Sequence, residues 1–324
     1  MTGMAGKAMA AVFALAAALT APARAAEISV TQWGTSLYGA PYAVAMEKGF
    51  FKEAGVDITG IIGSGGGGTT VRNILASPLP YGEVALSAAL AAQRQGLDVV
   101  IVNAAIRSAA ESTLLTMPDS DIKSLKDLAG KKVAITSPKG VSEMLLLMEL
   151  QKEGVDPASV TRVASGGYSN SLTLLQQGEV AAAGMIEPLS IIRKAEFRTV
   201  ARAKDILPAM TTAVGITTRE FAEANPGVIK AIIAGRRAGV RAIYADPAAA
   251  AEIVGRTFTL DPKVAQEAVA NMIGPRYWSE GEINQAELDE TVKGLALVGE
   301  VQDGVDWSKL IDTAYLPPEL QANP

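Results

Sequence analysis

The residues with the clearest chemical potential form a glycine-rich run, Gly63-Ser64-Gly65-Gly66-Gly67-Gly68-Thr69-Thr70. A glycine loop that follows a strand and opens a helix exposes backbone N–H groups at the positive end of the helix dipole, where anions and polar head groups bind. Such a loop needs no lysine and no catalytic side chain. The same residues also fit a flexible turn, so the run by itself leaves both interpretations open.

Two nucleotide-binding motifs also match this run, and each lacks an essential part. In the phosphate loop GxxxxGK[ST] a lysine reaches the β- and γ-phosphates, and Thr69 occupies that position here. The dinucleotide pattern GxGxxG is met by Gly63, Gly65 and Gly68, with Glu83 near the spacing of a ribose-binding acid. That acid should end a strand, whereas Glu83 begins a predicted one. Both interpretations therefore rank below the binding of a small anion.

Composition excludes several other chemistries. The chain has 324 residues and contains neither histidine nor cysteine. It therefore has no Ser-His triad, no imidazole base, no ordinary zinc site and no disulfide. Its formal net charge of −5 argues against nucleic acid, which clustered lysine and arginine bind. We expect no cofactor, no metal site and no nucleic-acid partner.

The first 25 residues have the layout of a secretory signal peptide. Lys7 precedes an apolar run from Ala8 to Leu19, and Ala23-Arg24-Ala25 has the small residues of a cleavage site. The run is shorter than the about 20 residues that span a bilayer. A buried N-terminal helix is the alternative. We predict cleavage near Ala25 and a mature protein in the periplasm.

The first two-thirds of the chain alternates strand and helix patterns, which predicts α/β lobes with parallel-rich sheets flanked by helices. The length suggests two domains. The predicted strands are Ile28–Trp33, Val56–Ile62, Glu83–Ser87, Val99–Ala104, Lys132–Ile135, Val160–Val163 and Ala181–Met185. The predicted helices are Pro41–Lys48, Val71–Ala76, Ala88–Arg94, Val141–Lys152 and Ser171–Gln177.

The last hundred residues are predicted to be helical. Asn225-Pro226, Asp246-Pro247 and Asp261-Pro262 each place a capping residue before a proline at the first helical position. The expected helices are Pro226–Tyr244, Pro247–Arg256, Pro262–Ile273 and Glu282–Leu297. We expect them to pack around one lobe and to carry no chemistry.

Four segments carry a family resemblance because they occur in one order along the chain. They are Pro41–Val56, the glycine loop, Ser124–Ala134 (SLKDLAGKKVA) and Leu175–Ala183 followed by Glu187-Pro188. Together they resemble periplasmic solute-binding proteins of ABC importers, in the sulfonate, nitrate and thiamine-precursor (taurine-type) class. Ala85 and Ala181 stand where that family usually has an acid, and we expect the fold to tolerate both.

The resemblance implies a type II-like periplasmic binding fold with two lobes and two crossovers. Lobe one would hold residues 26–112 and 209–324, and lobe two residues 113–208. The lobes would close on one small molecule and deliver it unchanged to a membrane permease, and the protein would be a monomer and not an enzyme. Related thiamine-pyrimidine synthases depend on a consumed histidine and on cysteine-rich iron chemistry, and this chain lacks both residue types.

Open α/β sheets bind ligands beyond the carboxyl ends of their strands, and this rule selects the candidate ligand-binding residues. Those of lobe one are Trp33, Gly34, Tyr38, Tyr42, Gly65, Gly66, Gly67, Gly68, Thr69, Ser87, Ala88, Arg107 and Ser108. Those of lobe two are Ser137, Lys139, Gly140, Ser142, Gly166, Gly167, Tyr168, Ser169 and Glu187.

Each side chain also has a structural interpretation. The aromatic residues could belong to the core, Lys139 could be solvated, and the two serines near Gly140 could cap a helix. Arg107 could pair with Glu111 across a surface turn, and Glu187 could be structural because it precedes Pro188.

Two helix N-termini facing one cleft favour an anionic head group, and four aromatic residues suit an organic body. We therefore expect a small organic anion, a sulfonate or a carboxylate. Nitrate and a pyrimidine thiamine precursor are alternatives, the latter with Glu187 accepting from its amino group. An enzyme or a sensor domain on the same scaffold would be a different class. For an enzyme, Glu187 with Lys139 is the one pair that can be assembled.

Overall fold

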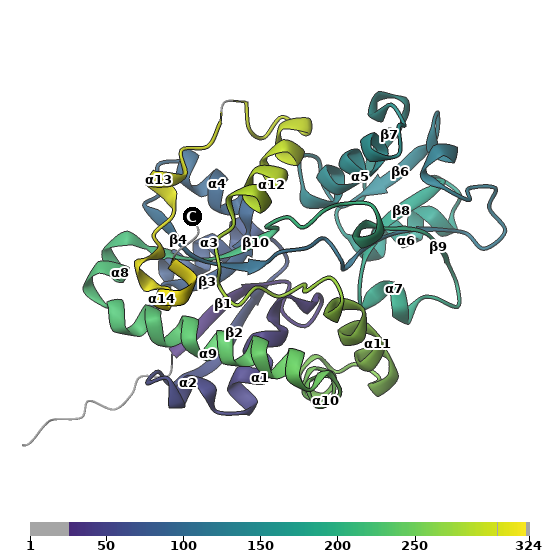
Figure 1. Cartoon of the computed structure of the whole chain (residues 1–324). Coiled ribbons are helices and arrows are strands. Elements are labelled where there is room, and N and C mark those ends of the chain that lie inside the picture. Colours follow the sequence, from purple (N-terminus) through teal and green to yellow (C-terminus); the bar gives the residue numbers. More distant parts are fainter. Residues whose placement is uncertain (1–25, 303, 322–324) are drawn as a thin grey trace, which may run out of the picture.

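The computed structural model describes residues 26–302 and 304–321, which form two lobes (Figure 1). Each lobe is built on a five-stranded mixed sheet flanked by helices. The predicted signal segment, residues 1–25, lies outside the described residues. Within the described range, every helix is too short or too polar to span a bilayer.

Lobe one is the part of the chain around a sheet with the strand order β2-β1-β3-β10-β4. Its strands are β1 (Ala26–Thr31), β2 (Ile58–Ser64), β3 (Tyr81–Ala85), β4 (Val99–Ile106) and β10 (Ala213–Thr218). Strand β1 is parallel to β2 and β3, and β10 is antiparallel to both β3 and β4. A late segment of the chain thus separates two early strands.

Lobe two surrounds a second sheet with the order β7-β6-β8-β5-β9. Its strands are β5 (Ser112–Thr116), β6 (Lys132–Ile135), β7 (Thr161–Ala164), β8 (Ala182–Ile186) and β9 (Arg198–Arg202). Strand β5 is antiparallel to both neighbours, whereas β6 is parallel to β7 and β8. The chain crosses between the sheets twice, over residues 107–111 and 203–212.

Eight longer helices follow the predicted segments closely. They are α3 (Gly67–Ala76), α4 (Leu86–Arg94), α5 (Val141–Lys152), α6 (Tyr168–Gln176), α9 (Pro226–Ala245), α10 (Pro247–Phe258), α11 (Pro262–Ile273) and α12 (Gln285–Leu297). The first helix is α1 (Ala40–Glu47), and the short helices are α2 (Phe50–Glu53), α7 (Leu189–Ile192), α8 (Arg219–Ala224), α13 (Trp307–Leu310) and α14 (Pro318–Gln321). Asp246 and Asp261 cap their helices as predicted, whereas the Asn225 amide donates to the Phe221 carbonyl instead.

A buried ion pair joins the helical C-terminal segment to the first sheet. Arg236 of α9 is 1% exposed, and its Nε lies 2.9 Å from Oε2 of the fully buried Glu83 on β3. Its two other guanidinium nitrogens donate to the Ser279 and Ala105 carbonyls, each at 2.8 Å. One side chain therefore ties together β3, β4 and the segment before α12. Glu83 is fully buried and paired with Arg236 through Oε2, so it is not exposed as the acid of a dinucleotide site would be.

The contact between α1 and α9 depends on one glycine and supplies a test of the packing. A Cβ on Gly239 of α9 would lie 2.3 Å from the Pro41 carbonyl oxygen of α1, which is backbone and cannot move aside alone. Gly239→Ala should therefore destabilise the protein by about 1–3 kcal/mol, the usual cost of overpacking. Urea unfolding followed by circular dichroism measures this.

The matched control lies in the same helix. Gly227 has open space where a Cβ would stand, so Gly227→Ala should be neutral or stabilising by up to about 1 kcal/mol through helix propensity. Equal stability of the two alanine variants would contradict the packing described.

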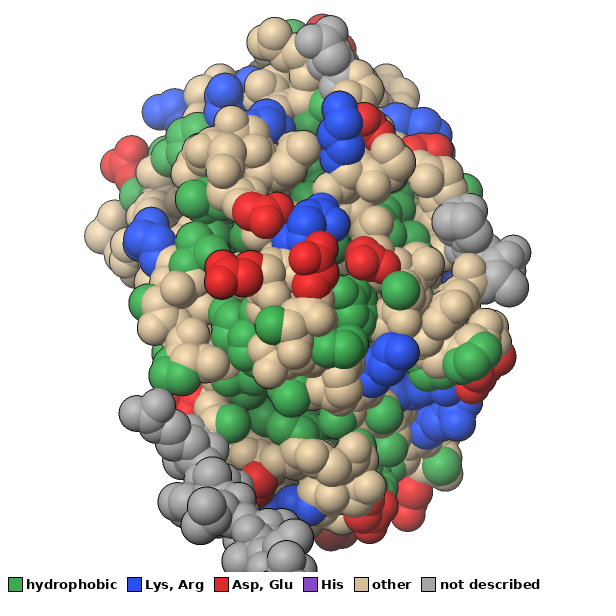
Figure 2. Space-filling view, turned by 90° about the vertical axis from the view of Figure 1, so that its left-hand side faces the viewer, with side chains coloured by type: hydrophobic (Ala, Val, Ile, Leu, Met, Phe, Trp, Pro, Cys, Tyr) green, Lys and Arg blue, Asp and Glu red, His purple; other side chains and the backbone are tan. Residues whose placement is uncertain are grey.

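One face of the molecule carries charges of both signs. In Figure 2, lysine and arginine side chains are scattered among acidic, polar and apolar ones, and they do not merge into a basic patch on that face. A scattered distribution of this kind differs from the basic stripe that tracks a phosphate backbone.

Candidate functional site

A cleft of about 460 Å³ opens between the lobes. Its size lies within the ordinary range for pockets that hold a small organic molecule. Both lobes supply its walls. Residues of the first crossover and of the start of β5 also line it: Ser108, Ala109, Glu111, Ser112, Thr113 and Leu114.

The glycine run forms the wall of the cleft that belongs to lobe one. Helix α3 begins inside the run, and a Cβ on Gly67 would lie 2.5 Å from the Ala88 side chain of α4, so a glycine is required there. The buried Thr70 hydroxyl lies 2.7 Å from the Thr31 hydroxyl and also contacts the Ser64 hydroxyl. These contacts fix the loop against the carboxyl ends of β1 and β2.

The opposite wall is the loop before α5 together with the start of α6. The Ser142 hydroxyl accepts from the Thr136 N–H at 2.9 Å, which holds the first turn of α5 against the end of β6. Lys139 adopts a positive φ of 60°, and its N–H donates to the Glu143 carboxylate at 2.6 Å. Tyr168 begins α6 and presents its ring to the cleft.

Four helices begin at the cleft, and all four lack a side-chain cap. The residues before α3, α4, α5 and α6 are Gly66, Ala85, Gly140 and Gly167, and none of them has a side chain that accepts a hydrogen bond from its helix. By contrast, Thr218, Asp246, Asp261 and Asn284 cap α8, α10, α11 and α12. First-turn N–H groups without a protein partner can donate to an anion in the cleft.

Two buried carboxyl groups, Glu111 and Glu149, also line the cleft. Glu111 is 8% exposed and Glu149 is 4% exposed. Burial raises the pKa of each carboxyl to about 8, and Glu187 adds to the effect at Glu111. Both carboxyl groups are therefore mostly protonated at neutral pH, so they do not repel an anion in the cleft.

Phenol groups surround Glu111. Tyr38, Tyr168 and Tyr277 approach it from the loop after β1, from α6 and from the segment before Trp278. Burial holds the pKa of the Tyr38 phenol well above its usual range, so its hydroxyl remains a donor at any physiological pH. This end of the cleft is therefore rich in neutral hydrogen-bond donors.

Many of the residues predicted from the strand-end rule line the cleft. They are Tyr38, Gly65, Gly66, Gly67, Gly68, Ser87, Ala88, Ser108, Ser137, Lys139, Gly140, Ser142 and Tyr168. The structure therefore brings together the glycine loop, both helix starts of lobe two and two of the four candidate aromatic residues. Whether they contact a ligand stays a prediction.

Two aromatic candidates belong to the packing instead. Tyr42 is fully buried in the core of lobe one, where its hydroxyl lies 3.4 Å from the Tyr81 hydroxyl. Trp33 packs edge-on against Phe258, with the ring centroids 5.0 Å apart, and it covers Gly39. Tyr42 therefore belongs to the core of lobe one, and Trp33 is partly buried against it.

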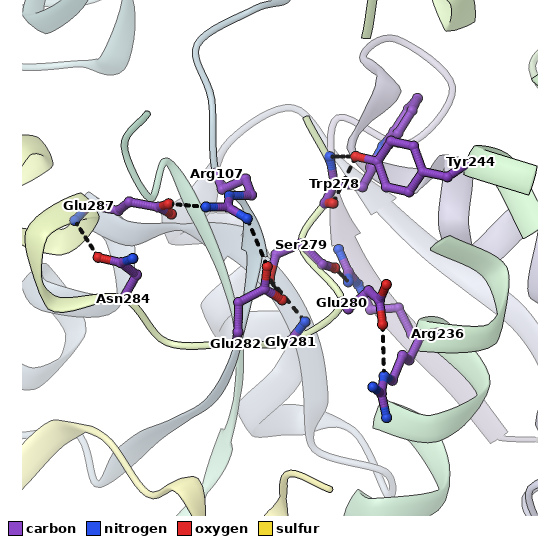
Figure 3. A network of polar contacts seen from close by, with 11 residues as sticks. Arg107, Arg236, Tyr244, Trp278, Ser279, Glu280, Gly281, Glu282, Asn284 and Glu287 are labelled. Carbon is purple, nitrogen blue, oxygen red and sulfur yellow. Dashed lines mark hydrogen bonds and ion pairs between the residues drawn. The ribbon is translucent and has the colours of Figure 1, made fainter. Parts of the chain in front are cut away.

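Arg107 is held outside the cleft by two acids from the α12 region (Figure 3). One guanidinium nitrogen lies 3.0 Å from Glu282 Oε1, and another contacts Glu287. Its expected partner, Glu111, instead lines the cleft. Arg107 thus anchors the first crossover to the segment that precedes α12.

Glu187 likewise does not line the cleft. It is fully buried, its Oε1 accepts from Arg202 at 2.7 Å, and the Asn271 amide donates to both of its oxygens. Lys139 lies 3.6 Å from Glu300. The Glu187–Lys139 pair that an enzyme would use is therefore not assembled, and both oxygens of Glu187 already accept hydrogen bonds from the protein.

The remaining candidates stand beside the cleft without lining it. Thr69 is exposed and accepts from the Arg72 guanidinium at 2.8 Å. Gly34, Gly166, Gly167 and Ser169 shape the turns after β1 and β7, and Gly34 and Gly166 take the positive φ that favours glycine.

Sequence reasoning missed several residues of the walls. They are Thr31, Gln32, Ser36, Glu111, Thr113, Leu114, Leu145, Leu146, Glu149, Met185 and Thr212. For Glu149 a signal was present, since it is an acid inside the apolar segment Met144–Leu150 of a predicted helix. Among the described residues, no group of three or more acidic side chains is placed to hold a metal ion.

The model of the NMT1/THI5-like family matches residues 36–250 of this chain. The search of curated proteins found no significant match to this chain. Several solved structures share its fold, among them two sulfonate-binding proteins and one nitrate-binding protein.

The periplasmic aliphatic sulphonate binding protein SsuA from Escherichia coli has a TM-score of 0.72 and 18% identity, covering 88% of this chain and 96% of its own. The alkanesulfonate-binding protein SsuA from Xanthomonas axonopodis pv. citri, bound to MOPS, has a TM-score of 0.70 and 17% identity, covering 90% and 98%. The periplasmic nitrate-binding protein NrtA from Synechocystis PCC 6803 has a TM-score of 0.72 and 13% identity, covering 90% and 86%. These similarities establish the two-lobed fold of periplasmic binding proteins.

Proposed function

Because the chain belongs to the NMT1/THI5-like family, we propose that it is a solute-binding protein that captures a small organic anion between its lobes for import. The ligand is a sulfonate or a carboxylate, and it leaves the protein chemically unchanged. A membrane permease of the ABC type receives it. The protein works as a monomer in the periplasm, after removal of residues 1–25.

One observation carries the anion assignment. The helices α3, α4, α5 and α6 each have a first-turn residue that lines the cleft, and each lacks a side-chain cap. Backbone donors at helix N-termini stabilise negative charge. The two acids in the cleft do not oppose this, since burial raises their pKa values to about 8.

The apolar part of the cleft favours an organic body over bare nitrate. Leu114, Leu145, Leu146 and Met185 line it next to the polar groups. A cleft of about 460 Å³ would leave a nitrate ion surrounded by unfilled space. The sulfonate-binding relatives support this choice, and the nitrate-binding relative supports the alternative.

The two crossovers suit a hinge. Residues 107–111 and 203–212 are the only described connections between the two sheets, so a change in their dihedral angles would move lobe one (26–112 and 209–324) relative to lobe two (113–208). Closure would bury the ligand between the glycine loop and the start of α5.

The test is a set of thermal melts of the purified protein with alkanesulfonates, aromatic sulfonates, carboxylates, taurine, nitrate and aminopyrimidines at millimolar concentration. A ligand at 100 times its dissociation constant adds about 2.7 kcal/mol, which raises Tm by several degrees. Sodium chloride at equal ionic strength is the control.

We expect a rise in Tm with organic anions, and mass spectrometry should recover the ligand unaltered. An altered ligand would establish an enzyme instead. A melting temperature that no anion changes would contradict the proposed function.

A further inference from the structure

Glu149 is a cleft-lining acid whose carboxyl group has no hydrogen-bond or ion-pair partner among the described residues. It lies on α5 and is 4% exposed. Glu143 on the same helix differs, since its carboxylate lies 3.1 Å from Arg162 and accepts from the Lys139 N–H.

A buried carboxyl group without a partner lowers the stability of the protein. Burial alone raises the pKa of Glu149 to about 8. A hydrophobic residue would fit the surrounding Leu145, Leu146 and Met148 at no such cost. Acids with perturbed pKa values are common at functional sites, and this carboxyl group therefore points to an interaction with a ligand in the cleft.

Among the residues that the structure describes, the cations at this end of the cleft are already paired with other acids. Lys139 lies 3.6 Å from Glu300 at the edge of the cleft, and Arg162 is bound to Glu143. Arg94 donates to Glu300 as well, at 2.8 Å. The partner of Glu149 must therefore come with the ligand, and the natural partner of a buried carboxylate is a protonated nitrogen.

The cleft-lining residues of α5 form a single stripe along the helix. Ser142, Leu145, Leu146 and Glu149 succeed one another at helical spacing, and all four face the cleft. The stripe starts at the uncapped N-terminus, continues over two apolar side chains and ends at the acid. An anionic group, an alkyl chain and a cationic group would match it in that order.

The length of the stripe sets the length of the ligand. Glu149 lies about two turns beyond Val141, or roughly 12 Å along the axis, at about 1.5 Å per residue. Helical side chains lean toward the N-terminus, which brings the carboxyl group to roughly 8 Å from the first-turn N–H groups.

We infer, resting on the proposed function, that the ligand is an elongated zwitterion, with its anionic group at the N-terminus of α5 and its protonated amine at Glu149. An ω-amino acid with a chain of about five methylenes spans that distance. A short amino acid cannot reach both ends. Glu149 is then the residue that selects amines over simple anions.

Isothermal titration calorimetry with matched ligands tests this. The purified protein is titrated with 6-aminohexanoate and hexanoate, and with 3-aminopropanoate and propanoate as the short pair. We expect 6-aminohexanoate to bind at least about tenfold more tightly than hexanoate, as a charge-assisted hydrogen bond provides. The short pair should show no such preference.

Two variants separate the acid from its surroundings. Glu149→Gln keeps the shape and removes the charge, so it should fold and should bind both six-carbon ligands with similar affinity. Glu153→Gln, an exposed acid just beyond the same helix, should keep the preference.

The outcomes distinguish the inference from the proposed function. If hexanoate and simple sulfonates bind but the amine adds nothing, the inference fails and the function stands. A preference that survives in Glu149→Gln also overturns the inference. If no anion of either pair or of the sulfonate panel binds, the proposed function itself fails.

Discussion

Replacing Arg236 by methionine should lower the free energy of unfolding by about 3–5 kcal/mol, the range measured when one partner of a buried ion pair is removed. The variant leaves the Glu83 carboxylate fully buried without its counter-ion. It also removes the donors to the Ser279 and Ala105 carbonyls, which hold the end of β4 to the segment before α12. Urea unfolding followed by circular dichroism measures the change.

A surface pair supplies the control. Arg256 lies 3.1 Å from Glu47, and both side chains are more than half exposed. Arg256→Met should therefore cost less than about 1 kcal/mol. Adding Glu83→Gln to Arg236→Met should recover part of the loss, because the buried charge disappears. A cost for Arg236→Met no greater than that for Arg256→Met would contradict the role given to this pair.

The second large effect is a loss of stability as the pH rises from 5 to 8. The pKa values of Glu111 and Glu149 are raised from 4.5 to about 8 in the folded protein. Between these values the unfolded chain has released both protons while the folded chain still holds them. Raising the pH therefore favours unfolding, and each carboxyl group accounts for a few kcal/mol across the window, at about 1.4 kcal/mol per pKa unit.

The double variant Glu111→Gln/Glu149→Gln isolates this effect, because amides do not titrate. Its Tm should exceed that of the natural protein by several degrees at pH 8 and by much less at pH 5. The variant Glu153→Gln/Glu179→Gln, which changes two exposed acids, is the control. If the difference in Tm between the double variant and the natural protein were the same at both pH values, the two carboxyl groups would not be protonated as described.

These two acids connect stability with binding. A buried carboxyl group without a partner lowers the free energy of unfolding. A ligand that supplies the partner should raise the free energy of unfolding again. Proteins commonly give up stability at the residues that recognise a ligand. Glu149→Gln should therefore melt at a higher temperature than the natural protein when both are free of ligand at pH 8.

Much of the fold could be predicted from local patterns. Strand β6 and helices α5 and α11 have the predicted bounds, because apolar periodicity and helix-starting prolines are signals within the segment itself. Strands β5, β9 and β10 were missed. Each pairs with strands that are distant in the chain, so no signal within the segment itself reveals it.

The site divides in the same way. The strand-end rule found the glycine loop and the turn before α5, because both follow directly from strand and helix boundaries. It could not show that the Tyr42 ring would lie over Arg236, or that Asn271 and Arg202 would occupy Glu187. Those partners are brought together by tertiary packing alone. Glu149 was missed for another reason: an acid in a predicted helix is ordinarily assigned to the solvated face, although the apolar residues around this one indicated burial.

The insertion of β10 between β3 and β4 also governs the order in which the protein can be completed during synthesis. All strands of the second sheet, residues 112–202, leave the ribosome before Ala213–Thr218 does. Until then the first sheet lacks β10, the strand that joins β4 to β3. At a synthesis rate of about 5–20 residues per second, β10 follows β4 after roughly 5–20 s. Throughout that interval the nascent first lobe is unfinished, a state in which an export machinery that threads unfolded chains could still accept it.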